Sequence, residues 1–388
     1  MTVTITPGLL RGTLTPPPSK SQSHRLLLAA ALAGPPSKIE NLAQSQDLDA
    51  TERCLAALLG SGDPVPHCDC GESGSTLRFL IPLALTLRGG GVFTGSGRLM
   101  ERPQEPYFDI FKKQNIRYSL DGGSLTVAGA LKPGVYSLPG NVSSQFVTGL
   151  LYALPLLDGD SSIMLTSPLE SRGYVDMTLD ALAQFGVTAE ARSSAEFRVP
   201  GNQRYSPACQ RVEADYSQAA FFLVAKELGN PLKIQGLRED SKQGDKVILA
   251  ACHQLSLPGT VTLDVSQCPD LVPALALFGA LRSGERTLLV GAARLRLKEC
   301  DRLDAVTKEL CKLGAHVEQT PDSLLISGVS ALHGGTVDSH NDHRIAMMLA
   351  IAATRATDPV TLTGAESVGK SYPGFWKDYV NLGGRVAP

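Results

Sequence analysis

Six times along the chain, a short polar stretch leads directly into a segment of almost purely apolar residues. The polar stretches are rich in Gly, Ser, Asn, Asp or Pro, and they lie near residues 20, 74, 144, 217, 270 and 342. An apolar segment without a polar face is typical of a helix that is buried on all sides. The first turn of such a helix carries free backbone N–H groups and a partial positive charge. The pattern therefore predicts six buried helices with polar N-terminal ends.

A second, amphipathic helix is predicted about 30 residues after the start of each buried one, a regular spacing that indicates a repeat. These second helices are expected to begin near residues 49, 103, 175, 244, 300 and 371. Strand pairs follow in two places, at residues 116–120 with 124–127 and at 316–318 with 323–326, and both are typical of hairpins. We expect six copies of one unit, built as strand, buried helix, strand, amphipathic helix and strand pair.

Six repeats divide naturally into two domains of three. The polar stretch 201–207 precedes a plausible boundary near residues 210–213. The first strand, within residues 1–13, could pair with either half.

Composition and charge exclude several classes of protein. The chain has 388 residues, 43% of them hydrophobic, which is enough for a folded core. Its 36 basic and 38 acidic residues leave a net charge of −2, so we expect neither nucleic acid nor a membrane surface as a partner. No targeting segment and no apolar stretch of about 18 residues are evident. Eight scattered cysteines favour a reduced, cytoplasmic protein.

Basic residues gather at several of the predicted helix starts. They occur in Ser19-Lys20-Ser21 with Arg25, Gly71 to Arg78, Glu101-Arg102-Pro103, Lys298 to Arg302, and Asn341-Asp342-His343-Arg344. A lysine or arginine is costly to bury alone, so these clusters point to anionic ligands. The alternatives are capped helices with solvated charges and, for residues 298–302, a solvated face with local ion pairs. Asp270 could equally be a functional carboxylate or a helix cap.

Two other motifs are rejected. His67-Cys68-Asp69-Cys70 has no second pair at zinc spacing, so no metal is expected. Residues 364–371 satisfy the P-loop pattern, but only 17 residues follow and Tyr372-Pro373-Gly374 interrupts the required helix. Lys370 could still bind a phosphate.

The clusters together resemble the 5-enolpyruvylshikimate-3-phosphate synthase family, and they occur in that family's order from about Gly12 to Trp376. The resemblance implies an α/β, two-domain enolpyruvyl-transferase fold, an inside-out α/β barrel with three βαβαββ repeats in each domain. One domain would comprise residues 14–212, and the other residues 1–13 with 213–388. A two-strand hinge near residues 12–18 and 210–214 would let the domains close around the ligands.

The resemblance also implies the reaction and its partners. The enolpyruvyl group of phosphoenolpyruvate would pass to the 5-hydroxyl of shikimate 3-phosphate, with release of phosphate and without a cofactor. Glyphosate would be an inhibitor, and the protein a monomer. By resemblance, phosphoenolpyruvate would be bound by Lys20, Gly74, Arg102, Gln145, Arg302, Arg344 and Lys370. Shikimate 3-phosphate would be bound by Ser21, Arg25, Ser143, Ser144, Gln145, Ser171, Tyr174, Asp270 and Lys298.

The resemblance assigns the proton transfers as well. Asp270 would be the base at the 5-hydroxyl, and Glu299 and Lys20 the candidates for proton transfer at the enolpyruvyl carbon. His343 and Asp47 would support them.

The chain departs from the family's usual residues at several positions. Glu72, Ser75 and Thr76 alter the glycine-rich segment, His24 replaces an Asn, and Arg294 stands where an Asn commonly contacts the shikimate phosphate.

Two alternative functions compete with this interpretation. One is the related UDP-N-acetylglucosamine enolpyruvyl transferase, which needs an active-site loop Cys that has no counterpart here. The other is a catalytically silent sugar-phosphate-binding protein. The presence of Asp270, Glu299 and Lys20 argues against the second.

Overall fold

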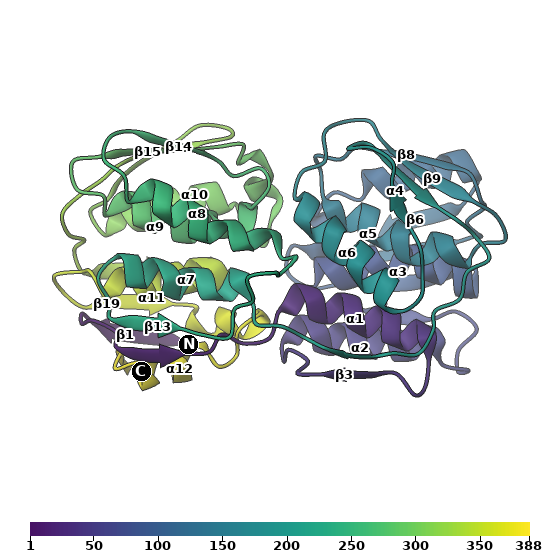
Figure 1. The fold of residues 1–388 in the computed structure, drawn as a ribbon, viewed down its shortest axis with the longest axis horizontal. Helices are drawn as coiled ribbons and strands as arrows, with labels where there is room; N and C mark the ends of the chain where they lie inside the picture. The colour runs from purple at the N-terminus through teal and green to yellow at the C-terminus, as the bar shows by residue number, and fades with distance from the viewer. The chain divides into compact units, whose positions relative to one another are not determined.

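A computed structural model describes all residues, 1–388, and its contacts divide the chain into two compact units. The continuous unit comprises residues 20–212, and the discontinuous unit comprises residues 1–19 with 213–388. Figure 1 shows helices layered against sheets within each of them.

The continuous unit contains three repeats. Its elements are α1 (Lys20–Ala33), β3 (Lys38–Glu40), α2 (Gln46–Leu59), β4 (His67–Asp69), α3 (Gly74–Arg88), β5 (Gly90–Thr94), α4 (Glu105–Gln114), β6 (Arg117–Asp121), β7 (Ser124–Ala128), β8 (Val135–Leu138), α5 (Ser144–Ala153), β9 (Ser161–Leu165), α6 (Arg172–Gln184), β10 (Glu190–Ala191), β11 (Glu196–Val199) and β12 (Cys209–Arg211). Two four-stranded sheets form, in the orders β4-β5-β7-β6 and β8-β9-β11-β10, and β3 pairs in parallel with β12.

The discontinuous unit repeats this plan. Its elements are β1 (Thr2–Thr6), β2 (Gly12–Leu14), α7 (Tyr216–Glu227), β13 (Leu232–Ile234), α8 (Ile248–Leu255), β14 (Val261–Asp264), α9 (Val272–Ala280), β15 (Arg286–Val290), α10 (Arg302–Lys312), β16 (His316–Gln319), β17 (Leu324–Ser327), β18 (Gly335–Asp338), α11 (His343–Ala353), β19 (Val360–Thr363), α12 (Phe375–Asn381) and β20 (Arg385–Ala387). Its four-stranded sheets run β14-β15-β17-β16 and β18-β19-β1-β20, and β2 pairs in parallel with β13.

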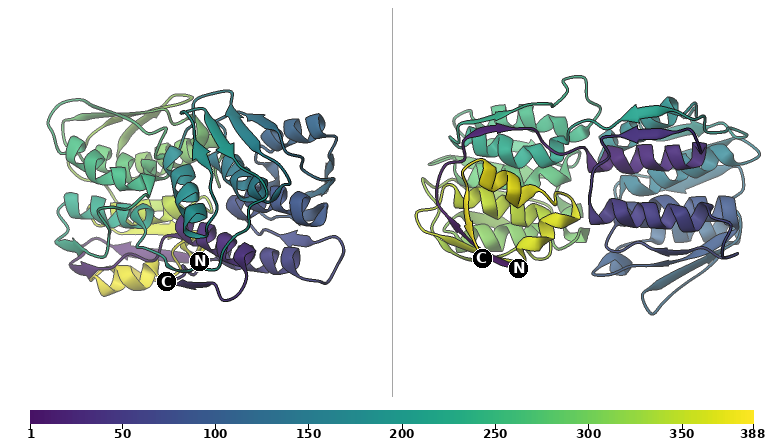
Figure 2. Two further views of the ribbon diagram at one scale, coloured as in Figure 1. Left: turned by 45° about the vertical axis from the view of Figure 1, so that its right-hand side comes forward. Right: turned by 90° about the horizontal axis from the view of Figure 1, so that it is seen from below.

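Each four-stranded sheet follows one rule. The two strands that flank a buried helix are parallel, and a hairpin then continues the sheet in antiparallel fashion. In the last repeat, β1 takes the hairpin position between β19 and β20, so the first strand of the chain completes the final sheet. The two chain ends therefore lie close together (Figure 2). The predicted α/β fold of repeated units is confirmed, as are both predicted hairpins.

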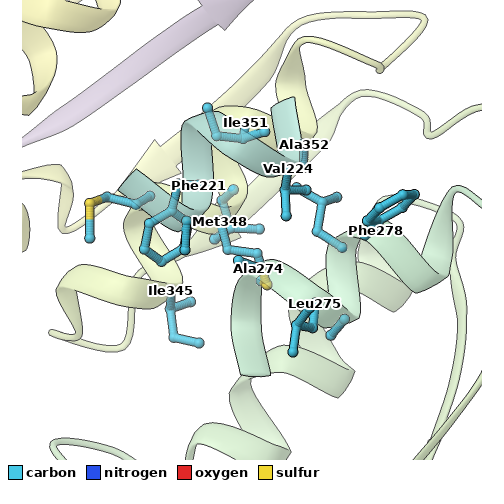
Figure 3. Close-up of a cluster of buried hydrophobic side chains, with 14 of the residues drawn as sticks. Phe221, Val224, Ala274, Leu275, Phe278, Ile345, Met348, Ile351 and Ala352 are labelled. Atoms are coloured by element: carbon cyan, nitrogen blue, oxygen red, sulfur yellow. The ribbon is translucent and has the colours of Figure 1, made fainter. Parts of the chain in front are cut away.

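The buried helices form the core of each unit. In the discontinuous unit, α7, α9 and α11 pack on one another through Phe221, Ala274, Met348 and their neighbours (Figure 3). All nine residues of α9 are buried. Because these helices have no polar face, their N-terminal turns are the places where polar groups can approach the core.

The amphipathic helices begin within a few residues of the predicted positions. The largest shifts occur where a short 3₁₀ helix comes first, at Gly244–Val247 before α8 and at Ala365–Lys370 before α12. The second of these turns occupies the P-loop-like segment, so no long helix opens there. No helix in the chain is long and apolar enough to cross a membrane.

Leu275 provides a test of this core. Replacing its fully buried side chain (Leu275→Ala) should lower the free energy of unfolding by about 2–5 kcal/mol, because the cavity cannot be refilled between packed helices. Leu249→Ala is the matched control, since Leu249 is 47% exposed on α8. Chemical denaturation would measure both variants, and equal losses would contradict the described packing.

Candidate active-site residues

Lys20 opens α1 and forms an ion pair with the second helix. Its Nζ lies 2.8 Å from Oδ2 of Asp47, which is in the first turn of α2, and both side chains are mostly buried. The pair fixes a cation at the start of one helix with a carboxylate at the start of the next.

Arg25 is buried one turn further along α1. Its Nε donates to Oγ1 of Thr178 at 2.9 Å and to the carbonyl of Tyr174 at 3.1 Å, while Nη1 donates to the carbonyl of Ser21 at 2.8 Å. Burial lowers the pKa of Arg25 to about 10, so the guanidinium is still charged at neutral pH. Because these bonds use hydroxyl and carbonyl oxygens, the positive charge is not neutralised by them.

Arg102 lies against the start of α3. A Cβ atom on Gly74 would come 2.8 Å from Nη1 of Arg102, so a larger residue at this position would displace the guanidinium. The buried Nε of Arg102 has no hydrogen-bond partner in the protein. Backbone N–H groups and a guanidinium therefore meet at one helix start, an arrangement suited to an anion.

Gln145 links the starts of α3 and α5. Its Oε1 accepts from Nη1 of Arg78 at 2.7 Å, and its Nε2 donates to Oγ of Ser75 at 3.0 Å. Ser143 caps α5 by accepting from the backbone N–H of Gln145, and Ser144 is the first, buried residue of that helix. Ser143 and Gln145 thus share one hydrogen-bonded cluster with Arg78, the basic residue of the Gly71–Arg78 motif, to which the family resemblance assigns no substrate contact.

Ser171 has a left-handed backbone conformation at the start of α6, with φ of 55°. This conformation is uncommon for residues other than glycine and is concentrated at functional sites. Tyr174 lies one turn later, with its ring centroid 5.7 Å from the guanidinium carbon of Arg25.

Arg302 is the centre of the polar cluster in the discontinuous unit. Its side chain is 1% exposed and contacts three carboxylates. Nε donates to Asp342 at 2.7 Å, Nη1 to Asp270 at 2.8 Å and Nη2 to Glu299 at 2.6 Å. A charge this deeply buried is stable only with such partners. The residues 298–302 are therefore not a solvated face, at least around Arg302.

Asp270 receives two further cations. Nη2 of Arg344 lies 3.0 Å from its Oδ2, and Nζ of Lys298 lies 3.5 Å from its Oδ1. Burial by itself would raise the pKa of Asp270, but Arg344, Lys298 and Arg302 outweigh it and hold the pKa well below its usual range. No side chain caps α9, so Asp270 is engaged with cations rather than acting as a plain helix cap.

The start of α11 completes this cluster. Asp342 caps the helix through the backbone N–H of Arg344, and it also binds Arg302. His343 is buried beside Asp342. Lys370 donates to the carbonyl of Asn341 at 2.7 Å, so the lysine of the P-loop-like segment lies at the same helix start.

Two electrostatic details were not predictable from motifs. Burial lowers the pKa of Lys298 to about 8, although Asp270 opposes the shift. Asp245, a buried residue of the turn before α8, has its pKa raised to about 6 by burial first and by Asp270 second. Asp245 sits in no recognisable motif, and only packing reveals its proximity to Asp270.

The structure thus places the sequence-predicted residues in two groups. Those of the continuous unit are Lys20, Ser21, Arg25, Gly74, Arg102, Ser143, Ser144, Gln145, Ser171 and Tyr174. Those of the discontinuous unit are Asp270, Lys298, Glu299, Arg302, His343, Arg344 and Lys370. All eight cysteines are free, and no group of three or more His, Cys, Asp or Glu is placed to hold a metal ion.

Comparisons with known proteins extend over the whole chain. The model of the EPSP synthase (3-phosphoshikimate 1-carboxyvinyltransferase) family matches residues 5–379. A 3-phosphoshikimate 1-carboxyvinyltransferase of Clostridium kluyveri is 46% identical, covering 99% of this chain and 98% of its own. One from Clostridium novyi is 43% identical over the same shares.

Solved structures are similar in fold. An EPSP synthase from Acinetobacter baumannii matches with a TM-score of 0.82 at 24% identity, covering 100% of both chains. The enolpyruvyl transferase NikO from Streptomyces tendae matches with a TM-score of 0.77 at 17% identity, covering 100% of this chain and 98% of its own. At these identities the likeness supports the fold alone.

The low pKa of Lys298 makes a prediction about stability and pH. Between about pH 8 and the usual lysine value, the unfolded chain binds the proton of Lys298 and the folded chain does not, so this residue should make stability rise with pH. Below pH 8 its charged form should reduce stability. Lys298→Met should lose this contribution, seen as a smaller gain in Tm from pH 8 to pH 10 than in the unsubstituted protein. Identical pH dependences would contradict the lowered pKa of Lys298.

Proposed function

This chain belongs to the EPSP synthase (3-phosphoshikimate 1-carboxyvinyltransferase) family, and we propose that the polar clusters at its helix starts bind and convert that family's two substrates. The enzyme transfers the enolpyruvyl group of phosphoenolpyruvate to the 5-hydroxyl of shikimate 3-phosphate and releases phosphate. Its product leads to aromatic amino acids through the shikimate pathway.

Phosphoenolpyruvate carries a carboxylate and a phosphate, so its site needs several cations. The proposed ligands are Lys20, the backbone at Gly74, Arg102, Gln145, Arg302, Arg344 and Lys370. Arg102 supports this best, because its guanidinium lies at a helix start and its buried Nε has no protein partner. Arg302 differs from the others, since its three nitrogens already contact carboxylates. Its main contribution would be to hold Asp270 and Glu299 in place.

Shikimate 3-phosphate requires a phosphate site and several hydroxyl partners. The proposed ligands are Ser21, Arg25, Ser143, Ser144, Gln145, Ser171, Tyr174, Asp270 and Lys298. Arg25 supports the phosphate assignment because its protein bonds leave its charge unneutralised.

The proposed chemistry uses side chains and substrates alone. Asp270 accepts the proton of the 5-hydroxyl as its oxygen attacks C2 of phosphoenolpyruvate, and Glu299 or Lys20 protonates the methylene carbon. The resulting tetrahedral adduct then expels phosphate, and loss of a methyl proton restores the enolpyruvyl double bond. His343 would support the charges that develop.

The observation that carries this assignment is the environment of Asp270. Three cations keep its carboxylate ionised, which is the form a general base needs. Two of them, Arg344 and Lys298, are also proposed ligands of the anionic substrates. Binding would draw part of their charge toward the substrates and raise the pKa of Asp270, so that the carboxylate becomes a stronger base when the hydroxyl is in place.

The alternative functions are less well supported. The matching family model and the two clostridial relatives carry the 3-phosphoshikimate name, which favours this substrate over a UDP-sugar. A silent binding protein would not need a mostly buried carboxylate held ionised by three cations.

Three further properties are proposed. The eight free cysteines suit a reducing compartment such as the cytoplasm. Glyphosate, an anion with a carboxylate and a phosphonate, would compete at the phosphoenolpyruvate cations. The chain would act as a monomer, because all assigned ligands come from one copy.

Asp270→Asn tests the assigned base. Asparagine keeps the shape but cannot accept the hydroxyl proton, so kcat should fall by about 10²–10⁴-fold, with a much smaller change in the KM for phosphoenolpyruvate. Phosphate release with both substrates would measure the rates. Asp322→Asn, on an exposed turn, is the control and should remain active. An unchanged kcat in Asp270→Asn would reduce Asp270 to a structural partner of the arginines.

A further inference from the structure

Two adjacent residues of α1 each contact buried, paired threonines: His24 contacts one member of its pair, and Arg25 contacts both members of the other. The four threonines are Thr51, Thr76, Thr148 and Thr178, and each has 0% exposure. A buried hydroxyl without a strong packing reason is retained only when its hydrogen bonds matter to the fold or to a neighbouring group.

The first pair lies between α2 and α3. The hydroxyl oxygens of Thr51 and Thr76 are 2.6 Å apart, and Nδ1 of His24 is 2.9 Å from that of Thr51. Both hydroxyls are also within hydrogen-bonding distance of the Asp47 carbonyl, at 3.1 and 3.3 Å. α1 and α2 run side by side in Figures 1 and 2, so this contact ties neighbouring helices together.

This pair is connected to two groups proposed to meet phosphoenolpyruvate. The carboxylate of Asp47 pairs with Lys20, so the position of the Asp47 backbone affects the ammonium group. Oγ1 of Thr76 also lies 2.7 Å from Oγ of Ser73, which caps α3 immediately before Gly74. The same hydroxyls therefore hold Lys20 and the Gly74 backbone at a fixed separation.

The second pair lies between α5 and α6. The hydroxyl oxygens of Thr148 and Thr178 are 3.0 Å apart. Nε of Arg25 donates to Thr178 at 2.9 Å, and Nη2 donates to Thr148 at 3.5 Å. Because a hydroxyl orients the guanidinium without neutralising it, the arginine keeps its charge for an anion. A carboxylate in the same place would compete with that anion.

The side chain of His24 suits the first pair for a related reason. Burial, followed by the charges of Lys20 and Arg25, lowers the pKa of His24 well below its usual range. A neutral imidazole can bind a hydroxyl between two cations without adding a third charge to the cluster.

We propose that the two threonine pairs are positioning residues with separate effects on the two substrates. The Thr51–Thr76 pair positions Lys20 and the Gly74 backbone, which are proposed to bind phosphoenolpyruvate. The Thr148–Thr178 pair positions the guanidinium of Arg25, which is proposed to bind the phosphate of shikimate 3-phosphate. This inference rests on the proposed function, in which Lys20 binds phosphoenolpyruvate and Arg25 binds shikimate 3-phosphate.

Valine substitutions test the separation, since valine replaces only the hydroxyl by a methyl group. Thr51→Val should raise the KM for phosphoenolpyruvate by about 5- to 10-fold and change the KM for shikimate 3-phosphate by less than about twofold. Thr178→Val should raise the KM for shikimate 3-phosphate by about 5- to 10-fold and change the KM for phosphoenolpyruvate by less than about twofold. Steady-state phosphate release with each substrate varied in turn measures both constants.

The serine variants Thr51→Ser and Thr178→Ser keep the hydroxyl and should stay near the unsubstituted values. If either valine variant does not fold, Thr76→Val or Thr148→Val takes its place in the same comparison. Equal changes in both constants, or no change in either, would overturn the inference, because general destabilisation cannot select one substrate.

Lys20→Met and Arg25→Lys, measured in parallel, separate this inference from the assignments beneath it. Suppose Lys20→Met raises the KM for phosphoenolpyruvate and Arg25→Lys raises the KM for shikimate 3-phosphate, while the valine variants change neither KM. The substrate assignments of Lys20 and Arg25 then stand, but the threonine pairs do not position these two side chains. If Lys20→Met instead raises only the KM for shikimate 3-phosphate, the assignments are wrong, and the inference falls with them.

Discussion

The structure of each candidate site depends on the need to stabilise charge that is buried at the start of a helix. Arg302 shows the constraint most clearly, because its side chain is almost completely buried and contacts three carboxylates. Removing a charge from water costs on the order of several kcal/mol, and only well-placed partners of opposite charge can offset that cost. The carboxylates of Asp270, Glu299 and Asp342 are therefore fixed by the arginine as much as it is fixed by them. Two of these three are the proposed proton-transfer groups.

The two units solve the same problem differently. In the discontinuous unit, buried arginines are paired with carboxylates, which keeps Asp270 ionised as a base and holds Glu299 in place beside Arg302. In the continuous unit, Arg25 is oriented by hydroxyls and carbonyls, and Arg102 lies against a glycine at a helix start. Charge left unneutralised in this way is suited to binding anions. Lys20 is the exception in the continuous unit, because its ammonium pairs with the carboxylate of Asp47.

Much of this organisation could be predicted from the sequence, because the repeat has a strong signature. Apolar segments opened by polar residues recur at regular spacing, and helices α3, α5, α7, α9 and α11 form where the pattern places them. The hydrophobic pattern alone could not predict the pairing of β1 with β19, although the family resemblance places the first strand with residues 213–388. The parallel pairing of β2 with β13 joins segments far apart in the sequence for which periodicity gives no signal.

The candidate residues divide in the same way. Lys20 and Arg344 stand in dense motifs at helix starts, so they could be proposed as ligands from residue type and position, whereas Arg102 is proposed through the family resemblance. The contact of Arg302 with three carboxylates could not be predicted, because a run of charges usually lies on a solvated surface. Asp245, Thr51, Thr148 and Thr178 stand in no motif, and Thr76 lies in the glycine-rich segment without an assigned role. Their proximity to Asp270, Lys20 and Arg25 arises from packing between helices that are distant in sequence.

A crystal structure of the protein with shikimate 3-phosphate and phosphoenolpyruvate bound is the most direct test of these assignments, with Asp270→Asn used to slow turnover. We predict the shikimate phosphate on Arg25, phosphoenolpyruvate on Lys20, Arg102 and Arg344, and the 5-hydroxyl within hydrogen-bonding distance of residue 270. Ligands bound away from these helix starts, or a 5-hydroxyl that faces away from residue 270, would contradict them.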